Sequence, residues 1–140
     1  ATALELALSR MEEAASRMKA LREHLESGLE ASVESLEITS KAAERTCNTT
    51  HFTVEQMEAG ALLTLLDEAG IACSAGSACS TGSLKPSHVL LAQGLAPKRL
   101  HGALRLSLSR ETTREEIDRV LELLPPMAER LRSLSTGGMG

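Results

Sequence analysis

The chain has 140 residues, of which 42% are hydrophobic and 24% are charged, and its formal net charge is −4. These values are typical of one globular domain and exclude a disordered or fibrous chain. The sequence contains no cluster of basic residues of the kind that predicts nucleic-acid binding. No uncharged run approaches the roughly 18 residues needed to cross a bilayer. We therefore expect a single domain that binds neither nucleic acid nor membrane, and a cytoplasmic location because no signal sequence is recognisable.

The first predicted element is one long amphipathic helix over residues 3–31. Its apolar positions recur every three or four residues, with charged residues between them. They are Leu4, Leu8, Met11, Ala15, Met18, Leu21, Leu25 and Leu29. The stripe is close to a heptad repeat over three to four heptads, so a short coiled coil remains an alternative.

The middle of the chain alternates between short strands and short helices. β-Branched and alternating residues predict strands at 35–39 and 49–54. A buried helix is expected over 58–69, ending at Gly70, where a left-handed cap favours glycine. A short strand at 71–73 then leads into a small-residue segment, 74–86, which we expect to be a mobile loop.

Another short helix, a strand and a final helix complete the expected order. The helix covers 87–93 and ends at Gly94, and the strand at 103–108 places leucines on one face and Arg105 on the other. The last helix spans 113–134 and begins at overlapping capping boxes, Thr112 with Glu115 and Thr113 with Glu116. We expect the pair Pro125–Pro126 to kink or restart it. Strands and helices do not alternate strictly, which favours an α+β fold.

The loop cysteine Cys79 is the strongest candidate for chemistry. It lies in the run GSACSTG, which contains no large side chain that could bury the thiol. A loop thiol near a cation or a helix N-terminus can be activated as a nucleophile, and a mobile loop can also carry it. The alternative is a surface linker whose cysteine is incidental. A phosphate-binding loop is excluded because the required Gly-Lys-Ser/Thr spacing is absent.

Other polar residues allow weaker hypotheses. Arg105 could bind a carboxylate in bidentate fashion, or form an ordinary salt bridge. His101 could act as a base, although each histidine of the chain has a more ordinary structural reading. Cys47 and Cys73 are expected to be small core residues, and three cysteines without a secretory signal do not form a disulfide framework. A zinc site is a further alternative, with Cys73, Cys79, His88 and His101 as its candidate ligands.

Three stretches together resemble the C-terminal, small domain of a cysteine desulfurase of the NifS/IscS type, in the class-V aminotransferase family. They are GIACSAGSACSTGSLKPSHVL, HGALRLSLSRETTREEID and LPPMAERLRSLS, with a weaker likeness through CNTTHFTVEQMEAGALLTLLDEAG and the opening helix. The resemblance implies the small domain of fold-type I pyridoxal-phosphate enzymes, in which a small antiparallel or mixed sheet is covered by the N-terminal and C-terminal helices.

The resemblance also implies roles for two residues and several partners. Cys79 matches the cysteine that takes sulfur from L-cysteine as a persulfide, and Arg105 matches the arginine that binds the substrate carboxylate. The long form of the loop implies transfer to an iron–sulfur scaffold or another acceptor protein, with Cys79 as a transient ligand of a shared cluster. A homo-oligomer, specifically a homodimer in the full enzyme, is also implied.

One departure from the family limits what this chain does alone. The large domain, with the lysine that binds pyridoxal phosphate, has no counterpart here. None of Lys19, Lys41, Lys85 and Lys98 has the expected sequence context. We therefore expect residues 1–140 to be inactive by themselves, without a cofactor of their own. A stand-alone persulfide or thiol carrier and an inert interaction module remain alternative functions.

Overall fold

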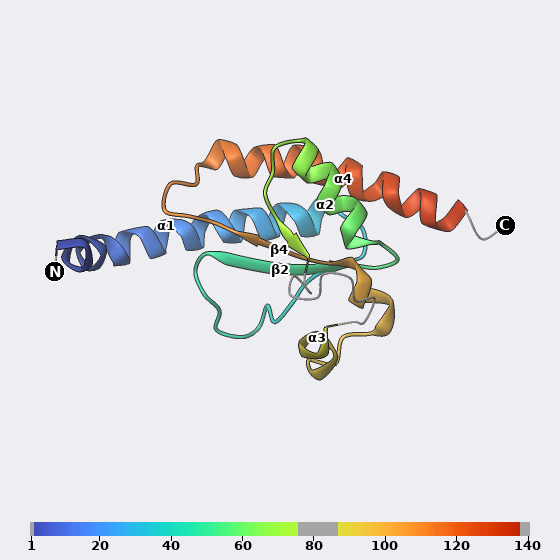
Figure 1. Ribbon diagram of the computed structural model, residues 1–140, viewed down its shortest axis with the longest axis horizontal. Helices are drawn as coiled ribbons and strands as arrows, with labels where there is room; N and C mark the ends of the chain where they lie inside the picture. Colours follow the sequence, from blue (N-terminus) through green and yellow to red (C-terminus); the bar gives the residue numbers. More distant parts are fainter. Residues whose placement is uncertain (1, 76–86, 138–140) are drawn as a thin grey trace.

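The computed structural model describes residues 2–75 and 87–137, and it has an α+β fold (Figure 1). The helices are α1 (Thr2–Ser32), α2 (Ala59–Glu68), α3 (His88–Ala92), the 3₁₀ helix η1 (Pro97–Gly102) and α4 (Arg114–Gly137). The strands are β1 (Leu36–Ile38), β2 (Thr49–Val54), β3 (Ser74–Ala75) and β4 (Ala103–Ser107). Within the described residues these strands form one sheet in the order β1-β2-β4-β3, with antiparallel pairing throughout. The predicted α+β class with a small antiparallel sheet is confirmed.

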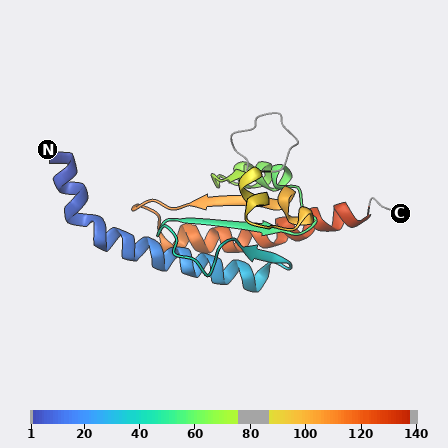
Figure 2. The ribbon, with the colours of Figure 1, turned by 90° about the horizontal axis from the view of Figure 1, so that it is seen from below.

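The main core lies between the sheet and the helices α1, α2 and α4. Figures 1 and 2 show α1 and α4 side by side, both on the same side of β2 and β4. Strand alternation places Phe52 of β2 and Leu104 of β4 on this face, opposite each other in the ladder, and both are fully buried. Leu25 of α1 and Leu124 of α4 complete the same apolar cluster.

The other face of the sheet has a smaller apolar cluster. Leu90 of α3, Leu100 of η1 and Ala103 of β4 are buried together there. Because Ala103 and Arg105 are two residues apart on one strand, they lie on the same face of the sheet. The small helices thus cover one end of this face and leave Arg105 exposed.

Two glycines end their helices as the sequence predicted. Gly70 has φ +78° and Gly94 has φ +76°. After α2 the Gly70 N–H bonds the Asp67 carbonyl at 2.9 Å, and the Ile71 N–H bonds the Leu66 carbonyl at 2.8 Å. This pair of bonds is a Schellman motif, which satisfies carbonyl groups that the helix end leaves unpaired.

The final helix begins where one of the two predicted capping boxes forms. The Glu116 N–H bonds Thr113 Oγ1 at 3.2 Å, and Glu116 Oε2 accepts the Thr113 N–H at 2.9 Å. Thr112 instead accepts a hydrogen bond from the Ser109 N–H at 2.9 Å. The second box, Thr113 with Glu116, therefore starts α4.

Two local predictions are wrong. Residues 71–73 are not a strand, because the Ile71 N–H is used to cap α2 and the chain first pairs with β4 at Ser74. Ser74 and Ala75, expected to begin the loop, form β3 instead, and the rest of that expected loop, residues 76–86, lies outside the described residues. Of the two outcomes expected at Pro125 and Pro126, a restart is wrong, because the last helix runs unbroken to Gly137, whereas a kink stays a prediction. Its apolar stripe continues past the prolines, and the burial of Leu124 and Ala128 on either side outweighs the lost backbone bonds.

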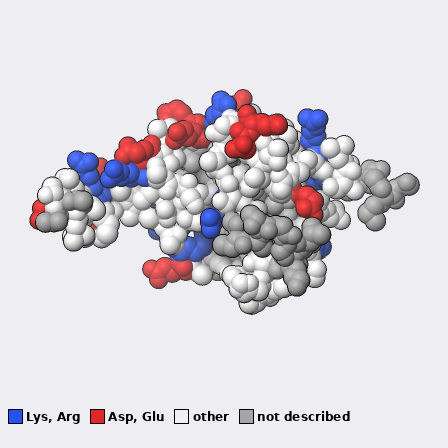
Figure 3. All heavy atoms as spheres, viewed as in Figure 1, with Lys and Arg blue, Asp and Glu red and all other residues white. Residues whose placement is uncertain are grey.

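Charges on the surface are interspersed. On the face seen in Figure 3, basic and acidic side chains of the described residues alternate along α1 and do not gather into a basic patch. Among the helices of the part that the structure describes, none is both long and apolar enough to cross a membrane.

Candidate functional site

The sheet aligns three polar side chains across three strands. His51 of β2 is the direct ladder partner of Arg105 of β4, and Ser74 of β3 is the partner of Arg105 on its other side. Direct partners in antiparallel strands point to the same face of a sheet. The order His51, Arg105, Ser74 therefore forms a polar row on the face opposite the main core.

Arg105 occupies the centre of this row with its guanidinium available. Its side chain is exposed, and among residues 2–75 and 87–137 it forms no hydrogen bond or ion pair. Arg99, by contrast, bonds the Ser35 carbonyl at 2.8 Å and pairs with Glu37 at 3.2 Å. An unpaired guanidinium on a rigid strand is suited to bind a carboxylate through two parallel hydrogen bonds.

The predicted nucleophile, Cys79, lies outside the described residues, and so does its suggested role as a transient cluster ligand. The described chain leaves the sheet at Ala75, the residue after the partner of Arg105, and resumes at Ser87 just before α3. Cys79 follows Ala75 by four residues. The row thus includes the strand from which the cysteine-bearing segment departs.

The other two cysteines have different surroundings. Cys73 packs against the main core as predicted, and burial together with the charge of Asp67 raises the pKa of its thiol, which disfavours the reactive thiolate. Cys47 is half-buried but lines a polar cavity beside Arg45, so its interpretation as a core residue is wrong. Neither cysteine lies in the polar row.

Candidate metal ligands are not brought together. Within the part of the chain that the structure describes, no three His, Cys, Asp or Glu side chains are grouped to bind a metal, and this part includes Cys73, His88 and His101. His101 is exposed and lies 3.9 Å from Glu58. His101 belongs to η1 and is not part of the polar row formed by His51, Arg105 and Ser74. The structure therefore provides no support for the hypothesis that His101 acts as a base.

His51 is the functional candidate that the sequence did not single out. Its Nδ1 lies 2.8 Å from Thr39 Oγ1, whereas its Nε2 is buried and has no hydrogen-bond partner among the described residues. Burial, and to a lesser extent the charge of Arg105, lowers the pKa of His51, so the ring is neutral at pH 7. The only signal in the sequence is a histidine within a β-branched run.

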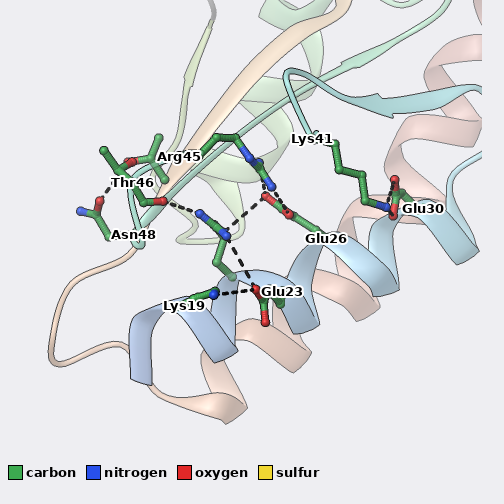
Figure 4. Close-up of polar contacts among 10 residues, drawn as sticks. Lys19, Glu23, Glu26, Glu30, Lys41, Arg45, Thr46 and Asn48 are labelled. Carbon is green, nitrogen blue, oxygen red and sulfur yellow. Dashed lines mark hydrogen bonds and ion pairs between the residues drawn. The ribbon is translucent and has the colours of Figure 1, made fainter. Parts of the chain in front are cut away.

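A buried ion network holds the segment that precedes β2 against α1. Figure 4 shows Arg45 facing Glu26, with Nη1–Oε1 and Nη2–Oε2 distances of 2.7 and 2.9 Å. Arg22, which lies on α1 one turn before Glu26, donates a hydrogen bond to the carbonyl of Thr46. Burial by itself raises the pKa of Glu26, but hydrogen bonding to Arg45 and the charges of both arginines outweigh it and hold that pKa below its usual value. The network fixes where β2, and with it His51, begins.

The lysines of the described residues, which are the residue type that binds pyridoxal phosphate, are each paired with a glutamate. The cavity beside this network has a volume of about 520 Å³ and includes Lys19 and Lys41. Both lysines pair with glutamates there, and Lys98, the remaining described lysine, pairs with Glu55. The same cavity is lined by four basic and four acidic side chains, so it has no net positive charge that would favour a phosphate group.

Comparison with known proteins shows the family to which the chain belongs. The family model described as "Aminotransferase class-V" matches residues 1–120. The chain therefore belongs to the class-V aminotransferase family, whose members generally use pyridoxal phosphate. Curated relatives are cysteine desulfurases. "Cysteine desulfurase 2" of Trichormus variabilis is 47% identical over 119 residues, and "Cysteine desulfurase NifS" of Azotobacter vinelandii is 45% identical over 133 residues.

These relatives are about three times longer than the chain. The matched regions cover 85% and 95% of this chain but only 30% and 33% of the two relatives. A solved NifS-like protein has a TM-score of 0.77 at 29% identity, covering 93% of this chain and 32% of that one. The NifS-like protein of Rickettsia africae gives the same TM-score at 27% identity, with 89% and 31% covered. The predicted resemblance to cysteine desulfurases is confirmed.

Proposed function

We propose that this chain is the sulfur-accepting part of a cysteine desulfurase. Arg105 binds the carboxylate of L-cysteine, and Cys79 receives its sulfur as a persulfide. The observation that carries the proposal is the polar row, because the available guanidinium of Arg105 lies beside β3, the strand that leads to Cys79. Family membership supports it, since the curated relatives are cysteine desulfurases.

The short stretch of chain between Ser74 and Cys79 limits how far the Cys79 thiol can lie from Arg105 in space. Ser74 is hydrogen-bonded beside Arg105, and Cys79 follows Ser74 by five residues. Five residues span at most about 18 Å. A carboxylate held by Arg105 and a thiol carried by this segment therefore belong to one region of the molecule, as sulfur transfer requires.

The division of labour places the cofactor elsewhere. Pyridoxal phosphate, when bound, acts as the electron sink that weakens the carbon–sulfur bond. We assign the cofactor to the part of the relatives that this chain does not match, and substrate positioning and the accepting thiol to this chain. The sulfur acceptor we propose is an iron–sulfur scaffold protein, with transient cluster ligation by Cys79, and the complete enzyme we propose is a cytoplasmic homodimer.

The test replaces the corresponding third of Azotobacter vinelandii NifS with this chain. We expect the chimera to release sulfide from L-cysteine in the presence of pyridoxal phosphate, and the isolated, folded chain to release none. Cys79→Ser should abolish persulfide formation, measured by intact mass as the gain of one sulfur atom. The matched variants Cys47→Ser and Cys73→Ser should retain it.

Two outcomes would change the proposal. Sulfur transfer that survives Cys79→Ser would show that the assigned thiol is wrong. Sulfur added to Cys79 of the isolated chain by a separate desulfurase would instead favour a stand-alone persulfide carrier. Unequal alkylation rates, with Cys79 fastest, are expected if the chain is not an inert module.

A further inference from the structure

Two polar groups in the row lack partners among the described residues and lie on directly opposed residues. His51 Nε2 is buried without a hydrogen bond, and the Arg105 guanidinium has none within the described chain. The two residues face the same side of the sheet as ladder partners. A buried polar atom without a partner costs free energy, and such atoms are rare in folded proteins.

The surroundings of His51 fix its orientation. The Thr39 side chain lies 2.8 Å from Nδ1, and the Thr39 N–H also bonds the His51 carbonyl at 2.9 Å. Nδ1 can donate its proton to the Thr39 hydroxyl oxygen, which leaves a lone pair on Nε2. In this tautomer the neutral ring accepts a hydrogen bond on the side that has no partner.

A neutral ring is also the form compatible with Arg105. A protonated imidazole would lack the lone pair and would repel the neighbouring guanidinium. Burial and Arg105 together oppose that protonation. The guanidinium carries five N–H groups, so one of them can bond Nε2 while two others remain for a carboxylate.

We propose that His51 is a positioning residue for carboxylate binding, whose Nε2 accepts a hydrogen bond from Arg105 and orients the guanidinium toward the ligand. The proposal rests on the proposed function insofar as Arg105 binds the carboxylate of L-cysteine. Thr39 supports this role by holding the imidazole ring in place. A cavity of about 380 Å³ lies beside the ring and is lined by Thr39 and His51 together with Val89 and Gln93. His51 is not assigned any contact with the reacting sulfur.

The first experiment reads the tautomer of His51 by ¹⁵N nuclear magnetic resonance of the full 140-residue chain. We expect a protonated Nδ1 and an unprotonated Nε2 at pH 7. Thr39→Val should shift this balance because it removes the hydroxyl oxygen that accepts the Nδ1 proton. A protonated Nε2 in the unchanged chain would overturn the proposal, because that atom could then accept nothing from Arg105.

The second experiment measures binding of L-alanine, which has the carboxylate of the substrate but no sulfur, with alanine amide as the uncharged control. His51→Phe keeps a planar ring but removes the acceptor, and it should raise the Kd about tenfold. His51→Gln offers an amide oxygen and should restore binding to within about threefold. His101→Phe, an exposed histidine outside the row, should leave the Kd unchanged.

The outcomes separate this proposal from the proposed function. An unchanged Kd in His51→Phe, equal loss in His51→Gln, or no binding of L-alanine to the original chain would overturn the positioning role. Because L-alanine carries no sulfur, the positioning role stands if these shifts occur even when Cys79 never forms a persulfide. Loss of persulfide chemistry alone would remove only the sulfur-transfer assignment.

Discussion

The two halves of α1 have the same apolar repeat but different surroundings. Leu21, Leu25 and Leu29 in the second half are buried against the sheet and α4. Leu4 and Leu8 in the first half are 64% and 57% exposed, and Figure 2 shows this part standing clear of the body. An apolar stripe on a helix thus predicts that this face is buried against something. It does not show whether the burying surface belongs to the same chain, because that depends on the rest of the fold.

The largest expected effect tests the buried half. Leu25→Ala removes a side chain that is 1% exposed and should lower the free energy of unfolding by about 3 kcal/mol, because it leaves a cavity in the main core. Leu8→Ala, the same change in the exposed half, should alter stability by less than about 0.5 kcal/mol. Urea unfolding followed by circular dichroism measures both. Similar losses at the two sites would contradict the difference between the halves.

A smaller effect tests the ion network attached to the buried half. Glu26→Gln should cost about 2 kcal/mol, because it replaces the charged partner of Arg45 and Arg22 in a buried setting. Glu12→Gln, in the exposed half, should have almost no effect. Thermal unfolding at pH 7 gives the comparison.

The same variant has a predictable pH dependence. The pKa of Glu26 is lower in the folded chain than its reference value of 4.5, so the unfolded chain binds more protons between these values. The stabilisation is therefore complete above pH 4.5 and is lost as the pH falls through the folded pKa. The original chain and Glu26→Gln should become equally stable under strongly acidic conditions, and a constant difference down to that range would refute the assignment.

The smallest expected effect tests the exposed half. The exposed apolar side chains of Leu4, Leu8 and Met11 should promote self-association of the isolated chain. The double variant Leu8→Lys, Met11→Lys should weaken that association by roughly tenfold or more. Leu134→Lys changes a similarly exposed leucine on α4 and serves as the control. Analytical ultracentrifugation measures the equilibrium, and a chain that stays monomeric at high concentration would contradict the prediction.

Local signals predicted most of the fold. Gly70 and Gly94 marked helix ends because only their local backbone angles were needed, and the pair Thr113 and Glu116 marked the start of α4 because a capping box is formed within four residues. The predicted restart of α4 at its prolines was wrong because the packing of α4 against the core is not visible in a local window.

The candidate site was predicted only in part. The alternation of leucine with Arg105 predicted that its side chain faces away from the core, and the resemblance to cysteine desulfurases implied its role. The row formed with His51 and Ser74 depends on which strands pair and in which register. Neither the pairing nor the register could be predicted, because these residues lie far apart in the sequence. The buried, unpartnered Nε2 of His51 becomes apparent only once the ladder and Thr39 are in place.

The brevity of β3 has a consequence for how this protein could be altered. Ser74 and Ala75 form all of β3 and pair with Arg105 and Leu104 of β4, and the described chain resumes at Ser87, just before α3. Strand β4 pairs with β2 at five positions but with β3 at only two, so its partner β2 supplies most of the ladder that holds Arg105 in place. If Arg105 binds a carboxylate as proposed, insertion or deletion after Ala75 should therefore leave the position of its guanidinium unchanged.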